Sequence, residues 1–212
     1  MIKNNSGFTL TEIAIVLAIF GLIIAGVFTL MLPVLTSAKI NKAINELGEI
    51  VNNVAANSAR RKPPVGAECI PYTDAESRRR LYEQRQQNIG GTLLFPDTML
   101  YEKGGTILLV TPWTTKVTDN NVTVELCGRG PAGALGIGVS VKYNDIPGGA
   151  VCSEFAMRSA ELISGAKLSY LSISGSDNLI DDGKIALGDI VKECGKNKND
   201  RRSISWFFRL TN

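Results

Sequence analysis

The 212-residue sequence contains no histidine, and one long stretch of it carries no charge. Without histidine the chain can form neither a histidine-dependent catalytic triad nor a histidine metal site. It also has no Walker sequence and no glycine-rich nucleotide fingerprint between a strand and a helix. A net charge of +3 does not favour a dedicated nucleic-acid binder. Carboxylate chemistry stays open, but no paired catalytic carboxylates can be located. We therefore expect no enzyme, no cofactor and no metal site.

Cysteine is absent from the N-terminal part of the chain and then occurs at four positions: Cys69, Cys127, Cys152 and Cys194. An even number of cysteines confined to one part of a chain fits two disulfides formed in an oxidising compartment. A metal site is the alternative, but no two cysteines have close ligand spacing and there is no histidine to complete one. Three connectivities are possible, and we favour Cys69–Cys127 with Cys152–Cys194.

Charged residues are missing altogether from Ile13 to Ala38, a run of 26 positions. At about 1.5 Å of rise per residue a helix of this length measures roughly 39 Å, more than the hydrocarbon core of about 30 Å. The run is too long for the apolar core of a removable secretory signal, which has about 7 to 15 residues. A lone carboxylate, Glu12, precedes it directly. Because an ionised side chain in a bilayer costs on the order of 3 kcal/mol or more, Glu12 is a candidate functional residue that requires a partner.

The residues before the run are Gly7-Phe8-Thr9-Leu10-Thr11-Glu12, and Gly21 lies nine positions after Glu12. This segment resembles the prepilin signature of type IV pilins and their pseudopilin relatives, over roughly residues 6–60. The resemblance implies that a membrane-embedded prepilin peptidase cuts between Gly7 and Phe8 and that the new terminal residue, Phe8, is N-methylated. It also implies that Glu12 pairs with the terminal amine of a neighbouring subunit during assembly. An ordinary signal anchor with an incidental glutamate is the alternative for the same residues.

Elementary chemistry is consistent with these roles. Gly7 allows the backbone to extend into a peptidase site, and cleavage creates an α-amine that is largely cationic near neutral pH. Opposite charges in lipid-like surroundings have to meet, because each is otherwise uncompensated. We expect that Glu12 does not easily reach its own terminus within a helix, so that a neighbouring chain supplies the amine.

Behind the run, apolar residues recur in steps of four and three, which places on one helix face Ile40, Ile44, Leu47, Val51 and Val54. The helix is therefore expected to continue from Phe8 to about Lys62, ahead of Pro63, with this stripe packed on a globular domain. Coiled-coil pairing is the competing interpretation. Pro33 should loosen the helix locally, since proline removes a donor and clashes with the preceding turn.

The rest of the chain mixes helix and strand patterns. A capping box of Thr73 and Glu76 predicts a helix to about Asn88, and a second helix is predicted over 150–164. Residues with strand character predict strands at 106–110, 122–126, 138–143, 167–174 and 203–210, and the fourth of these alternates. An acidic segment between the last two strands could hold calcium through Asp177, Asn178, Asp181, Asp182 and Asp189. A hairpin turn at Asp182-Gly183 is the favoured interpretation of that segment.

The predicted fold class is α/β (α+β): a long N-terminal helix packed on a mainly antiparallel sheet, pilin-like, with a disulfide-bounded C-terminal region. The predicted parts are a leader (1–7), a transmembrane and filament-core helix (8–38), its amphipathic continuation (39–62) and an extracytoplasmic head domain (63–212). The head resembles the larger type IVb pilins, whereas the seven-residue leader follows the type IVa pattern. The subclass stays open.

The resemblance implies a structural subunit of a type IV pilus, serving adhesion, motility, conjugation or DNA uptake. Its expected partners are further copies of the chain in a helical filament, prepilin peptidase, an assembly ATPase and an inner-membrane platform, with no nucleic acid. The precursor would reside in the inner membrane and the product in an extracellular pilus. A type II secretion pseudopilin is the alternative, and a membrane-anchored periplasmic enzyme a remote one.

Overall fold

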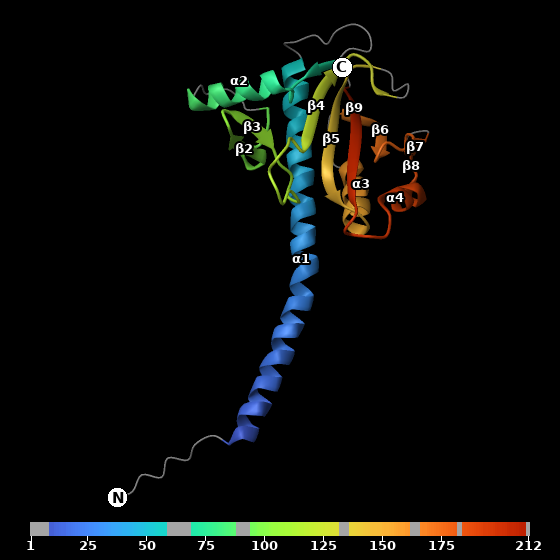
Figure 1. Cartoon of the computed structure of the whole chain (residues 1–212). Helices are drawn as coiled ribbons and strands as arrows, with labels where there is room; N and C mark the ends of the chain where they lie inside the picture. The colour runs from blue at the N-terminus through green and yellow to red at the C-terminus, as the bar shows by residue number, and fades with distance from the viewer. Residues whose placement is uncertain are drawn as a thin grey trace, which may run out of the picture. The chain divides into compact units, whose positions relative to one another are not determined.

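The computed structural model describes residues 9–58, 69–87, 94–131, 136–161, 166–181 and 184–210 (Figure 1). The chain divides into two compact units, Met1–Ala38 and Lys39–Asn212. The first unit contains the early turns of helix α1, Leu10–Ser58. The second contains the later turns of α1 and all other described elements, so the head is treated below together with the end of that helix.

The later turns of α1 bury the apolar stripe that the sequence predicts. All five residues of the stripe are at most 5% exposed. Two further residues of this part of the helix, Ala43 and Ile50, are also buried. The helix ends at Ser58 within the described residues, and the predicted end near Lys62 lies outside them.

Helix α1 is continuous through Pro33, and the expected loosening there stays a prediction. Proline fixes φ near −65°, which is a helical value, and it removes only one backbone donor. A helix can therefore continue through a proline, as α1 does here.

The described strands form a five-stranded sheet in the order β1-β4-β5-β9-β6, and every neighbouring pair is antiparallel. The strands are β1 Cys69–Pro71, β4 Val122–Cys127, β5 Gly138–Pro147, β6 Ala166–Ile173 and β9 Arg201–Leu210. The C-terminal strand β9 thus lies between β5 and β6 (Figure 1). The predicted helix on an antiparallel sheet is confirmed, whereas β1 was not predicted.

The core lies between α1 and the inner face of this sheet. One register row across four strands is wholly buried and consists of Val124, Val141, Trp206 and Leu171. Helix α3, Ala150–Glu161, adds Phe155, whose ring centroid lies 5.3 Å from that of Trp206. The indole N–H of Trp206 donates to the Ser159 hydroxyl at 2.8 Å, so this large side chain is buried with its polar atom satisfied.

Helix α2, Ala75–Gln86, begins differently from the prediction. Its N-cap is Asp74, whose side chain accepts the Ser77 N–H at 3.1 Å. The Thr73 hydroxyl instead accepts the N–H of Val124 at 3.0 Å, at the edge of β4 beyond the end of β1. The predicted box of Thr73 and Glu76 is therefore wrong: tertiary contact with the sheet edge takes the threonine, and the adjacent aspartate caps the helix.

Smaller elements complete the second unit. A 3-10 turn, η1 (Asp97–Met99), leads into the hairpin of β2 (Leu100–Lys103) and β3 (Thr106–Leu109). Helix α4 (Leu187–Cys194) follows a two-residue pairing of β7 (Ile180–Asp181) with β8 (Lys184–Ile185). Neither β2 nor α4 was predicted, whereas β7 and β8 flank the predicted hairpin turn at Asp182-Gly183.

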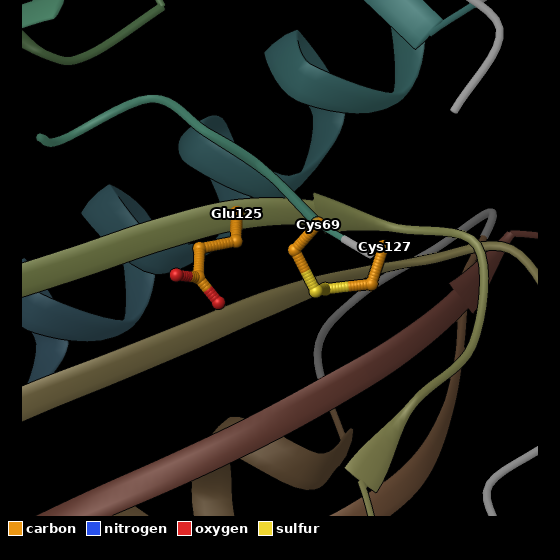
Figure 2. Close-up of side chains that lie close together, drawn as sticks. All are labelled: Cys69, Glu125 and Cys127. Carbon is orange, nitrogen blue, oxygen red and sulfur yellow. A yellow bond between two sulfur atoms is a disulfide. The ribbon is translucent and has the colours of Figure 1, made fainter. Parts of the chain in front are cut away.

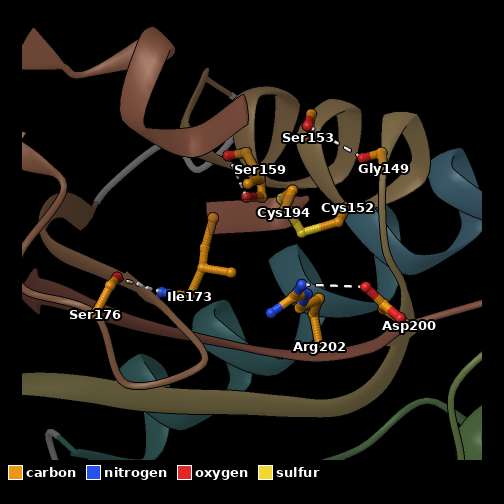
Figure 3. The surroundings of a disulfide bond; sticks show 10 residues. Gly149, Cys152, Ser153, Ser159, Ile173, Ser176, Cys194, Asp200 and Arg202 are labelled. Carbon is orange, nitrogen blue, oxygen red and sulfur yellow. Dashed lines mark hydrogen bonds and ion pairs between the residues drawn. A yellow bond between two sulfur atoms is a disulfide. The ribbon is translucent and has the colours of Figure 1, made fainter. Parts of the chain in front are cut away.

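Both favoured disulfides are present in the structure. Cys69–Cys127 joins β1 to β4 at directly paired positions, and Cys152–Cys194 joins α3 to α4 (Figure 3). The bridges close segments with sequence separations of 58 and 42 residues. In the chain-entropy model each bridge of this size contributes about 4 kcal/mol.

Two glycines of the second unit should respond oppositely to alanine. At Gly138 a Cβ would lie 2.5 Å from Cζ of Phe207 and 2.6 Å from the backbone oxygen of Phe208, so Gly138→Ala should destabilise the chain by about 1–3 kcal/mol. At Gly48, in α1, a Cβ meets nothing within 4 Å, and Gly48→Ala should stabilise the chain by about 0.5–1 kcal/mol. Thermal unfolding of the full chain in detergent measures both changes. A wild-type melting temperature for Gly138→Ala would contradict the packing described here.

Candidate functional site

The candidate site is the start of α1 and the uncharged run behind it. Gly7 and Phe8, the predicted processing residues, lie outside the described residues. The description begins at Thr9, and Glu12 lies in the first helical turn.

Thr9 and Glu12 form a reciprocal capping box. The backbone N–H and the hydroxyl of Thr9 each donate to Oε2 of Glu12 at 2.8 Å. The N–H of Glu12 in turn approaches the Thr9 hydroxyl oxygen at 3.3 Å. Such a box satisfies donors that a helix start otherwise leaves unpaired. A carboxylate in the first turn also interacts favourably with the helix dipole.

The box places the Glu12 carboxylate beside the residue that follows Phe8. Its signal, a threonine three positions before a glutamate, was readable in the sequence but was interpreted only as part of the processing motif. The expectation that Glu12 does not reach its own terminus concerns Phe8 and so lies outside the described residues. The structure does show that Glu12 folds back as far as the amide of Thr9.

The run behind Glu12 presents its apolar side chains to the surroundings. Those with exposed fractions of 46–76% are Ile13, Ile15, Val16, Leu17, Ile19, Phe20, Leu22, Ile23, Ile24, Val27, Phe28, Leu30, Met31, Val34 and Leu35. Exposed apolar surface of this extent marks a membrane or protein contact. In the part of the chain that the structure describes, α1 is the one helix long and apolar enough to cross a membrane, judged by length and composition.

A group of potential metal ligands, Cys69, Glu125 and Cys127, lies together on β1 and β4 (Figure 2). Their ligand atoms lie within 4.8 Å of one another. Both sulfur atoms belong to the disulfide, however, and the thiolate is the form of cysteine that binds metals. This group is therefore a cross-link beside a half-buried carboxylate.

In the acidic segment from Asp177 to Asp189, Asn178 has a local structural role. The side-chain oxygen of Asn178 accepts the N–H groups of Leu171 and Ile180 at 3.1 and 3.2 Å. Pairing of β7 with β8 fits the favoured hairpin, whose turn residues Asp182 and Gly183 lie outside the described residues. Within the described ranges, the acidic side chains of this segment form no close group of ligand atoms.

Comparison with known families bears directly on this site. Residues 2–28 match the family model described as the prokaryotic N-terminal methylation motif. This is the signature of type IV pilin-like proteins. The match covers Gly7, Phe8, the Thr9–Glu12 box and most of the uncharged run. The motif indicates a type IV pilin-like or pseudopilin-like protein, subject in general to prepilin peptidase processing and filament assembly. No curated protein matches the chain.

Proposed function

We propose that the chain is a structural subunit of a type IV pilus. Prepilin peptidase cuts between Gly7 and Phe8, the processed chain waits in the inner membrane, and an assembly ATPase with its membrane platform adds it to an extracellular filament. The observation that carries this proposal is the exposed, uncharged first part of α1, which directly follows Glu12 within the methylation motif.

The exposed run supports storage in lipid followed by assembly with copies of itself. Moving a Leu, Ile or Phe side chain from apolar surroundings into water costs about 1.5–3 kcal/mol. The run contains many such residues. A subunit can therefore leave the bilayer at low cost only when another apolar surface replaces the lipid. Equivalent helices of neighbouring subunits provide that surface in a filament core.

Glu12 is proposed to set the register between neighbours. Its carboxylate is held at the helix start by Thr9, with Oε2 accepting both Thr9 donors. Both Thr9 donors contact Oε2, and Oε1 is the oxygen that we propose to pair with the cationic amine of a neighbouring Phe8. Pairing of these charges offsets the cost of each in apolar surroundings.

A type II secretion pseudopilin is the second candidate, because pseudopilins carry the same N-terminal motif. The large head and the two disulfides favour the pilus subunit. We further propose that the chain is not an enzyme, since it contains no histidine and no paired catalytic carboxylates were located in its sequence.

Material sheared from cells tests the proposal most directly. Electron microscopy and mass spectrometry should find abundant filaments composed of a chain that begins at methylated Phe8. A processed chain confined to the membrane fraction would favour the pseudopilin. An uncut chain would contradict both and indicate a plain signal anchor.

Replacing Gly7 with leucine should leave the precursor uncut, because the bulky side chain prevents the extended approach to the peptidase. The mass of the chain in the membrane fraction measures this. Gly21→Leu is a matched control, since a Cβ at Gly21 meets nothing within 4 Å in α1. The control should be cut normally, and normal trimming of Gly7→Leu would refute the assigned cleavage position.

Replacing Glu12 with alanine should permit cleavage but reduce the yield of filaments at least tenfold, because the neighbour's amine loses its partner. Filaments are quantified from sheared material and the processed chain from membranes. Thr9→Val separates the two roles of the box, since it removes the hydroxyl contacts and retains the carboxylate. Wild-type filament yield from Glu12→Ala would exclude the register role. Equal losses in both variants would assign the defect to the helix start.

A further inference from the structure

Glu46 is a buried carboxylate on the later turns of α1 that the proposed function does not use. The residue is 4% exposed, and its Oε1 accepts the Thr98 hydroxyl of η1 at 2.6 Å. Lys42 lies one turn earlier, with Nζ 3.7 Å from the same oxygen, and about half of its side chain is exposed. The other oxygen, Oε2, is buried, and no described residue donates a hydrogen bond to it.

A carboxylate oxygen in this position is costly when ionised. An ionised group removed from water needs donors for its oxygens, and only Oε1 has them. A proton on Oε2 removes the charge and turns that oxygen from an unsatisfied acceptor into a donor. Burial accordingly raises the pKa of Glu46, and the hydrogen bond from Thr98 and the charge of Lys42 oppose that rise only in part.

The groups around Glu46 have identifiable effects. From α1, Lys42 favours the ionised form and Glu49 disfavours it. From β5, Tyr143 is wholly buried; burial raises its pKa well above the usual value, so it stays neutral. From η1, Thr98 is neutral, and the Asp97 carboxylate is paired with Arg85 at 3.5 Å.

We propose that Glu46 is a proton-sensitive clamp, which takes up a proton as the surroundings acidify and thereby fastens the later turns of α1 more firmly to η1 and β5. Tyr143 lies close enough for the charge of Glu46 to act on it, and its hydroxyl donates to the sulfur of Met99 at 4.0 Å. Thioether sulfur is a weak acceptor. The clamp concerns the fold of the second unit and does not depend on filament assembly.

The direction of the pH effect follows from linkage. Because the pKa of Glu46 is raised by folding, the folded chain binds more protons than the unfolded chain between the ordinary glutamate value, about 4.3, and the raised one. The free energy of unfolding then falls as pH rises through that window. The stabilisation is complete below the ordinary value and is lost above the raised one.

Thermal unfolding of the full chain in detergent, between pH 4 and pH 8, tests the clamp. As pH falls, the melting temperature of wild type should rise relative to that of Glu46→Gln by at least about 2 °C. A modest change in stability produces a shift of this size in a chain of this length. Comparing pH dependences cancels any constant effect of the amide. Asp119→Asn is the control: it removes an exposed carboxylate that is not among the groups acting on Glu46, and it should follow the wild-type pH dependence.

A second variant keeps the proposal testable if Glu46→Gln does not fold. Thr98→Val removes the hydroxyl that favours the ionised form, so proton uptake should move to higher pH. Infrared absorption of the protonated carboxyl group follows that uptake directly. The clamp would be overturned if the melting temperatures of wild type and Glu46→Gln changed in parallel with pH. It would also be overturned if Thr98→Val left the pH midpoint of proton uptake unchanged.

Discussion

Helix α1 carries apolar side chains along its whole length, but the structure provides an internal partner only for its later turns. From Ile40 to Val54 the apolar side chains are buried against the sheet, whereas those from Leu10 to Leu35 are largely exposed. The sheet depends on this contact, because its inner row, including Val141 and Trp206, is buried by side chains from helices. Removing the helix would expose that row to water, at about 25 cal/mol for each Å² of apolar surface. The head therefore includes the end of the helix as part of its core.

The order of strands adds a second constraint. The last strand, β9, pairs with both β5 and β6, so the sheet is incomplete until the C-terminal residues have arrived. Pairings between distant segments form slowly, because loop entropy has to be lost before contacts compensate. The bridge from Cys152 to Cys194 fixes the chain just before β9 begins. Nearby, the N–H of Gly149 donates to the Cys194 oxygen at 3.0 Å, and that of Gly148 to the Asp200 oxygen at 2.8 Å.

How much was predictable depended on the length of each pattern. The helical stripe, the five longer strand segments and the disulfide pairing could be predicted, since each has a sustained pattern or few alternatives. Strands β1, β2, β7 and β8 have two to four residues and carry too little pattern to detect, whereas β3, of four residues, was predicted because it lies in the apolar run 106–110. Helix α4 was missed because it is only eight residues long and exposes apolar Leu187 and Val191. The choice of Asp74 over Thr73 as N-cap depended on the edge of β4, which no local pattern reveals.

Glu12 and Glu46, both on α1, show how position decides what a carboxylate does. Glu12 lies at the helix start, where Thr9 supplies two donors to one oxygen and the dipole favours negative charge. Glu46 lies in the core, where one oxygen has the Thr98 hydroxyl and the other has no described donor. The environment of Glu12 stabilises a negative charge next to an apolar run. The environment of Glu46 favours the neutral, protonated carboxyl group. The uncharged residues between them meet neither condition, because a carboxylate there would have neither an N-terminal dipole nor a core hydroxyl beside it.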